Sequence, residues 1–156
     1  VKEWLTPVRQ FEPRSWDGRT RRVGVEEYVE NVDAILAAAR ARGTRVIAVT
    51  PPVNPFARPS GISRLANAAE VEAFGQAVVA RINAGDVQGA LAEVDRVLAR
   101  DPHAFYARWL RGLALAQAGE LAAAEAEIEQ AFEDDPFADR APASYRRALA
   151  DWARAR

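Results

Sequence analysis

The side chain best suited to acid–base catalysis near neutral pH is histidine, and the chain has only one, His103. A base at this position would need a nucleophile beside it. Four serines are available: Ser15, Ser60, Ser63 and Ser144. None of them lies in a Gly-x-Ser-x-Gly setting, and His103 follows Pro102 where a helix is expected to begin. We therefore interpret His103 as an exposed helix-start residue and predict no catalytic residue in this chain.

The acidic run Glu133-Asp134-Asp135 offers oxygen ligands for a metal ion, but its spacing matches no calcium loop. Cysteine is absent, which excludes disulfides and cysteine-ligated metals. We interpret the run as a solvated helix end. The sequence predicts no metal site and no cofactor.

Three arginines, Arg81, Arg108 and Arg111, are the candidate binding residues. They fall on the first helices of two expected helical hairpins, and such helices line the groove of helical-repeat folds. Guanidinium groups there would pair with the carboxylates of an acidic peptide or protein. The alternative, that these arginines only solvate the face, stays open.

A second candidate site is the segment Thr50-Pro51-Pro52-Val53-Asn54. It leaves the carboxyl end of an expected strand, where ligands bind in open α/β sheets. Thr50, Pro51, Pro52 and Asn54 are therefore candidates for the rim of an active site. The alternative is a rigid proline-rich connection.

Residues 1–60 are expected to form a partial α/β segment. Apolar residues recur at three- and four-residue steps over 25–42, which predicts a helix ending at Gly43. The run 44–50 is short, apolar and β-branched, which predicts a buried strand followed by a proline-rich loop at 51–60. Such a strand needs neighbours, and no second strand pattern occurs. Its sheet is therefore expected from the missing remainder of the chain or from a partner.

Residues 61–140 contain an internal repeat. Gly85 pairs with Gly119, Ala90 with Ala124, and Asp101-Pro102 with Asp135-Pro136. The paired residues are each 34 positions apart. This constant offset, with small residues at fixed points, is similar to the tetratricopeptide pattern, in which each repeat is a helix–turn–helix. The first helices match less well, since Gly112 in the second repeat corresponds to Val78 in the first. We predict two such hairpins, followed by a capping or returning helix over 141–156.

Composition bounds the remaining possibilities. The chain has 156 residues, 49% of them hydrophobic, and a net charge of −1, which is globular composition. Neither a nucleic-acid partner nor a membrane span is predicted. The arginine and alanine bias suits a GC-rich bacterial genome, and the lack of cysteine fits cytoplasm and periplasm equally. Because position 1 is not methionine, we expect an internal piece of a longer protein.

The order of motifs resembles the middle of a bacterial SGNH (GDSL-type) hydrolase-like protein with tetratricopeptide repeats inserted before its last strand. The motifs that carry the resemblance are Tyr28-x-x-Asn31, Thr50-Pro51-Pro52-x-Asn54 and Asp134-Asp135-x-Phe137-x-x-Arg140-Ala141-Pro142. The resemblance implies a flavodoxin-like α/β/α sandwich and ester hydrolysis or acyl transfer by serine, histidine and aspartate. The family's Gly-Asp-Ser and Asp-x-x-His blocks do not occur here, so no catalytic residue is carried over and this chain alone is expected to be inactive.

Two functions follow from these patterns. In the first, the chain is an internal segment of an SGNH-type hydrolase-like protein. In the second, it is a tetratricopeptide interaction module without enzymatic activity, which binds a peptide or protein in its groove.

Overall fold

The computed structural model describes residues 23–54, 58–59, 68–135 and 141–156. Within these ranges the chain forms six α-helices and no β-strand. The helices are α1 (Val25–Arg40), α2 (Ala68–Asn83), α3 (Val87–Leu98), α4 (Phe105–Gln117), α5 (Leu121–Asp134) and α6 (Ala143–Arg154). The expectation of a mostly helical chain is confirmed.

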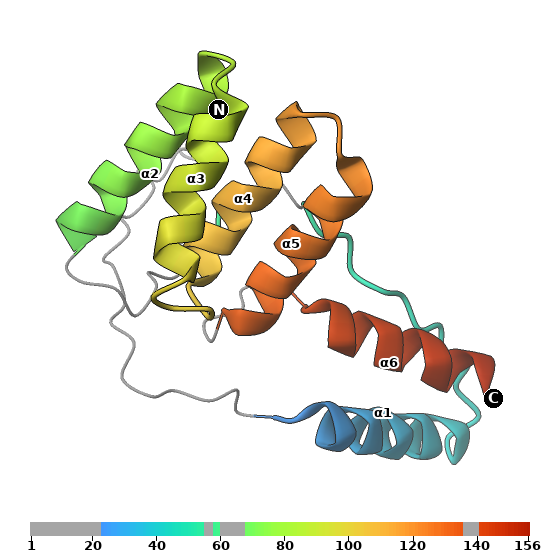
Figure 1. Ribbon diagram of the computed structural model, residues 1–156. Helices are drawn as coiled ribbons and strands as arrows, with labels where there is room; N and C mark the ends of the chain where they lie inside the picture. The colour runs from blue at the N-terminus through green and yellow to red at the C-terminus, as the bar shows by residue number, and fades with distance from the viewer. Residues whose placement is uncertain (1–22, 55–57, 60–67, 136–140) are drawn as a thin grey trace, which may run out of the picture.

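Helices α2 to α5 form two consecutive hairpins, which lie side by side in Figure 1. The backbone N–H groups of Gly85 and Asp86 donate to carbonyls in the last turn of α2. Those of Gly119 and Glu120 make the same two bonds to α4, at the equivalent positions of the second repeat. Both glycines have positive φ, 79° and 84°, a conformation that side chains disfavour. The two turns thus share their hydrogen bonding and backbone conformation.

The main hydrophobic core is centred on α4, which packs against α2, α3 and α5. Phe105 and Leu110 on α4 are fully buried. Ala90 on α3 and Ala124 on α5 occupy equivalent repeat positions, and both are buried. Small side chains at these positions let the paired helices approach closely, which is the physical basis of the repeat pattern.

A second, smaller core joins α1 to α6, below and beside the hairpins in Figure 1. Its buried members are Leu36, Leu149 and Trp152, with three partly buried residues of α1 packed around them. The Trp152 Nε1–H donates to Asp33 Oδ1 at 2.8 Å, and the Arg156 guanidinium lies 4.8 Å above the Trp152 ring. Helices α1 and α6 therefore form a unit with its own packing.

The prediction of a buried strand over 44–50 is wrong for the described chain. The segment is extended but forms no strand, and Val46, Ile47 and Val49 are 41%, 87% and 71% exposed. A strand needs a hydrogen-bonded neighbour, and the described residues supply none. The α/β part of the expected fold class is therefore not supported, and residues 51–54 adjoin no sheet edge in the described part of the chain.

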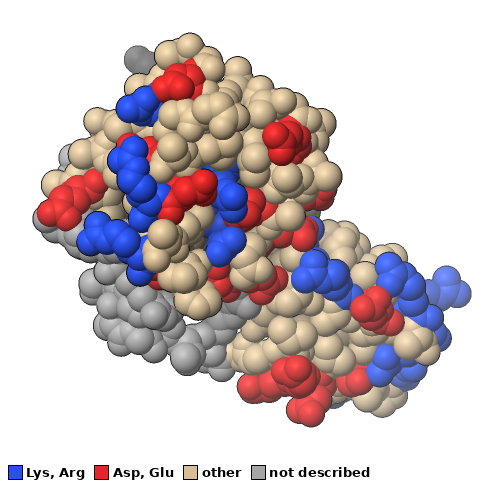
Figure 2. Space-filling model, viewed as in Figure 1, with Lys and Arg blue, Asp and Glu red and all other residues tan. Residues whose placement is uncertain are grey.

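Charged side chains are distributed unevenly over the surface. Figure 2 shows basic and acidic side chains interspersed over the hairpins, basic ones over α6 and acidic ones along the edge of α1. Three of the four acidic residues of α1 lie in its first half, and α6 carries Arg146, Arg147 and Arg154. The hairpin surface in this view therefore combines both signs of charge.

Candidate interaction groove

Two of the arginines predicted to bind ligand are paired within the chain. The Arg108 and Arg111 Nη1 atoms lie 3.0 and 2.9 Å from the two carboxylate oxygens of Glu127 on α5. Arg111 Nε also lies 3.3 Å from Asp95 on α3, so it connects three helices. An acidic ligand would have to compete with Glu127, and binding by these arginines stays a prediction.

The third arginine, Arg81, lies at the turn of the first hairpin. Its Nη1 donates to Asp86 Oδ2 at 2.6 Å, while Asp86 Oδ1 accepts a 2.9 Å bond from the Gly89 N–H and so caps α3. The Gly89 bond, followed by the Arg81 bond, holds the pKa of the Asp86 carboxyl below its ordinary value of 3.8. Arg81 thus supports a helix cap.

His103 lies beside a carboxylate, with Nδ1 3.4 Å from Asp134 Oδ1, and its side chain is 66% exposed. The Ser144 hydroxyl donates to Glu133 Oε2 at 2.9 Å, and the other three serines lie outside the described residues. Across the described ranges, no group of three or more histidine, aspartate or glutamate side chains is placed to hold a metal ion.

The predicted rim residues Thr50, Pro51, Pro52 and Asn54 are exposed and do not converge on a sheet edge. Val53, between them, is partly buried and packs against the main core. The segment therefore lies against α5, where it borders a pocket that the sequence did not predict.

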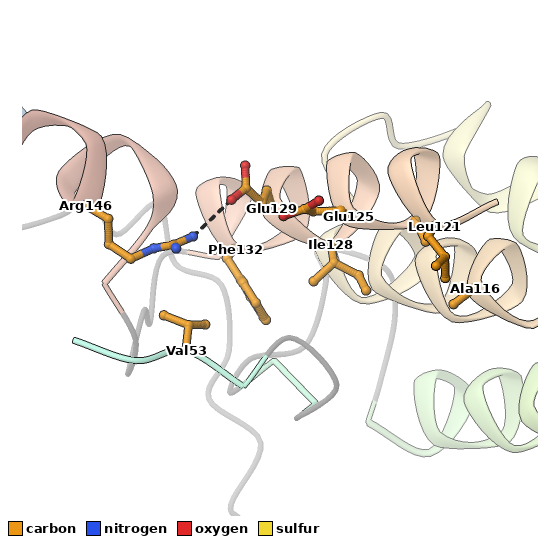
Figure 3. A pocket seen from close by; sticks show the side chains of 9 residues that line it. Val53, Ala116, Leu121, Glu125, Ile128, Glu129, Phe132 and Arg146 are labelled. Atoms are coloured by element: carbon orange, nitrogen blue, oxygen red, sulfur yellow. Dashed lines mark hydrogen bonds and ion pairs between the residues drawn. The ribbon is translucent and has the colours of Figure 1, made fainter. Parts of the chain in front are cut away.

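This pocket has a volume of about 290 Å³ and runs along α5, with Val53, the end of α4 and Arg146 of α6 completing its lining. Its lining residues are Val53, Ala116, Leu121, Ala124, Glu125, Ile128, Glu129, Phe132 and Arg146. Figure 3 shows Val53 facing Phe132 at one end, where Arg146 also reaches Glu129, while Leu121 and Ala116 lie at the other end. We call this surface the α5 groove.

The α5 groove occupies a defined place in the repeat. Most of its lining residues fall on α5 or the end of α4, and their counterparts one repeat earlier are Ile82, Val87, Ala90, Leu91, Val94, Asp95 and Leu98. All of these except Asp95 belong to the main core or pack against it, because α4 covers α3. Leu121, the counterpart of Val87, is instead 69% exposed. The groove thus lies at the hairpin-stacking face of α5, where Leu121 is exposed while the side chains of Ile128 and Phe132 are mostly buried.

Sequence reasoning missed this groove although the same repeat offset marks it. Applied to the covered face of α3, the 34-residue offset identifies the corresponding positions on α5. The repeat pattern does not predict in which direction the chain continues after α5, and this direction decides whether the face is covered. Helix α6 contacts α5 but extends away from the hairpins (Figure 1), so it covers only one end of the face.

In the described part of the chain, every helix is too short or too polar to cross a membrane. No protein-family model, no curated protein and no solved structure matches the chain.

Proposed function

We propose that this chain is a protein-interaction module made of two tetratricopeptide-like helical hairpins. Supporting this, the two turns repeat their hydrogen bonds and positive-φ glycines at equivalent positions, and the equivalent residues Ala90 and Ala124 are both buried. In such arrays each hairpin contacts only its neighbours, and the exposed surfaces bind other proteins.

The observation that carries the proposal is the open α5 groove. A hairpin array buries its stacking faces against the next helix, so the last face needs a cover. Here that face retains an exposed Leu121 and a pocket with a largely apolar lining. Concave apolar surface with a few polar groups at its edge is typical of a binding site.

The test is selection of peptides from a displayed library on the immobilised full chain, followed by calorimetric titration of the selected peptides. We expect saturable binding with micromolar dissociation constants, equivalent to about −8 kcal/mol. The matched control is Leu110→Asp, which places a carboxylate in the main core and removes the folded hairpins. Selection of no saturable binder, or equal binding to the Leu110→Asp variant, would contradict the proposal.

A second candidate function is favoured by one observation. Val46, Ile47 and Val49 form a β-branched, extended and exposed segment directly after α1, and Ile35 on α1 is also 64% exposed. A helix followed by such a segment has the composition of a sheet-building unit whose neighbouring strands are supplied from elsewhere. This supports the proposal of an internal segment of an SGNH-type hydrolase-like protein.

The encoded sequence on both sides of the chain tests this second candidate. It requires a Gly-Asp-Ser block before residue 1 and an Asp-x-x-His block after residue 156. If both are present, Ile47→Asp is expected to destabilise the longer protein, because Ile47 would then be covered by its sheet. The same substitution in the present chain should change the free energy of unfolding by less than about 0.5 kcal/mol, since Ile47 is exposed. A reading frame without these blocks would overturn the hydrolase candidate.

A further inference from the structure

The contact between α3 and α4 shows what the hairpin-stacking face accepts inside this molecule. Helix α4 packs against α3, where Val94 is fully buried in the main core and Leu91 packs against that core. At the edge of that face, Arg111 of α4 lies 3.3 Å from Asp95 of α3. The hairpin-stacking face of α3 therefore packs against a helix that has an apolar stripe and a basic side chain at its edge.

The α5 groove repeats this chemistry with more negative charge. Ile128 and Phe132 form its apolar floor, and Glu129 stands at the position equivalent to Asp95. Glu125 stands where α3 has Leu91, which adds a second carboxylate to the edge. The groove therefore has one more carboxylate than the covered face of α3, while Arg146, which also lines it, pairs with Glu129.

The chain itself shows that this acidic edge accepts guanidinium groups. Arg146 and Arg147 of α6 lie 3.1 and 3.4 Å from the two carboxylate oxygens of Glu129. They approach from the closed end of the groove, where Val53 also lies, while Leu121 marks the open end (Figure 3). Helix α6 thus supplies the charge partner without covering the apolar floor.

We propose that the α5 groove binds an amphipathic helix of a partner protein, apolar on one side and basic along its edge. The helix would lie on α5 as α4 lies on α3, with its apolar side on Leu121, Ile128 and Phe132. Its basic side chains would face Glu125 and would compete with Arg146 and Arg147 for Glu129. Helix-in-groove binding of this kind uses anchors at three- and four-residue spacing. This inference rests on the proposed function and names the partner class for it.

The test uses a peptide of residues 104–118 of this chain, which contains α4 with Arg108 and Arg111. The peptide carries fluorescein, and its anisotropy is titrated with the full chain. We expect saturable binding that Leu121→Glu weakens about tenfold or more, because the substitution removes the exposed apolar anchor and replaces it with a charge. Leu121 is exposed, so the substitution leaves the fold intact, which a melting curve checks. Ile35→Glu on α1 is the matched control, since Ile35 is similarly exposed and lies outside the groove.

A charge exchange then tests the partner chemistry. The peptide with Arg108→Glu and Arg111→Glu should bind the unsubstituted chain about tenfold more weakly, because like charges then meet at the groove edge. The Glu125→Arg variant of the chain should bind this acidic peptide better than it binds the basic one. Loss of preference with retained binding would contradict the basic-helix assignment.

The remaining outcomes separate this inference from the proposed function. If library peptides bind the chain but neither Leu121→Glu nor Glu125→Arg affects them, the module function stands and the groove assignment is overturned. If no peptide of either kind binds, both fail. If the chain sediments as a dimer that Leu121→Glu dissociates, the occupant is a second copy, and the partner-helix assignment is overturned.

Discussion

Gly112 on α4 lies so close to Ile128 on α5 that a β-carbon added to Gly112 would come within 2.5 Å of Ile128 Cγ1. The same added atom would also lie 3.0 Å from the Ala124 carbonyl oxygen. The absence of a side chain at this position sets the separation of the two helices. Since Ile128 and Ala124 also line the α5 groove, this contact fixes the position of the groove floor.

Gly112→Ala is therefore expected to destabilise the second hairpin. Overpacking of a core costs about 1–3 kcal/mol, while the better helix propensity of alanine returns about 1 kcal/mol. Because the nearest contacts include backbone as well as Ile128, we expect a net loss of about 1 kcal/mol in the free energy of unfolding, measured by urea denaturation.

The control for this substitution is the double variant Gly112→Ala, Ile128→Ala. Ile128→Ala alone should cost about 2–5 kcal/mol because it opens a cavity. The methyl group added at residue 112 would occupy part of that cavity, so the double variant should lose less than the sum of the two single losses. Additive losses would show that the two residues do not compete for the same space.

The Asp86 cap makes the stability of the first hairpin dependent on pH. Its carboxyl pKa is lowered, first by the bond from Gly89 N–H and then by Arg81. The resulting stabilisation is fully present above the ordinary value of 3.8 and is lost as the pH falls through the lowered pKa. Asp86→Asn keeps a capping oxygen but removes the titration. We expect this variant to melt below the unsubstituted chain at neutral pH and to approach its melting temperature at strongly acidic pH.

Glu120, the counterpart of Asp86 in the second hairpin, provides the comparison. Its side chain makes no cap hydrogen bond to α5, so Glu120→Gln should leave the pH dependence unchanged. If Glu120→Gln changes the melting temperature at acidic pH as much as Asp86→Asn does, the cap is not the source of the pH dependence.

Glu127 neutralises two partly buried guanidinium groups, those of Arg108 and Arg111. Glu127→Gln would remove the carboxylate that both share, leaving Arg111 with Asp95 and Arg108 with Asp134, and we expect a loss of about 1–3 kcal/mol in unfolding free energy by chemical denaturation. Asp151→Asn is the control, because the Asp151–Arg154 pair is exposed and should contribute at most about 1 kcal/mol. Equal effects of the two substitutions would contradict the role given to the Glu127 contacts.

Because α1 packs in a core separate from that of the hairpins, we expect α1 to unfold locally while the hairpins stay folded. Trp152→Ala removes the central side chain of the smaller core and the bond to Asp33. We expect the amides of α1 to exchange with deuterium much faster, while those of α3 to α5 keep their protection. Trp152→Phe retains most of the packing and should give an intermediate result. Faster exchange throughout α3 to α5 would instead indicate a single cooperative unit.

Local signals predicted the helical part of this fold well. The helix expected over 25–42 forms as Val25–Arg40, and the glycines at 85 and 119 form the two hairpin turns as their spacing indicates. The mismatch between Val78 and Gly112 also has a physical reason. Val78 is fully buried in the main core, whereas Gly112 admits Ile128.

The exposed segment 44–50 shows what local signals leave undetermined. Its β-branched composition favours extended backbone, and the backbone is extended, but burial depends on neighbours that composition does not supply. The intrachain partners of the predicted binding arginines are undetermined from local signals for a similar reason. Arg108 and Arg111 have the charge of ligand-binding residues, but both donate hydrogen bonds to Glu127 on the next helix.

The most direct measurement uses the absence of cysteine from the sequence. Leu121→Cys gives a single attachment point for an environment-sensitive fluorophore at the open end of the α5 groove, and Ile35→Cys gives a matched exposed site on α1. The central claim predicts a blue shift of the label at residue 121 that saturates with the residue 104–118 peptide, and none at residue 35. No shift at residue 121 despite saturable binding, or equal shifts at both sites, would contradict it.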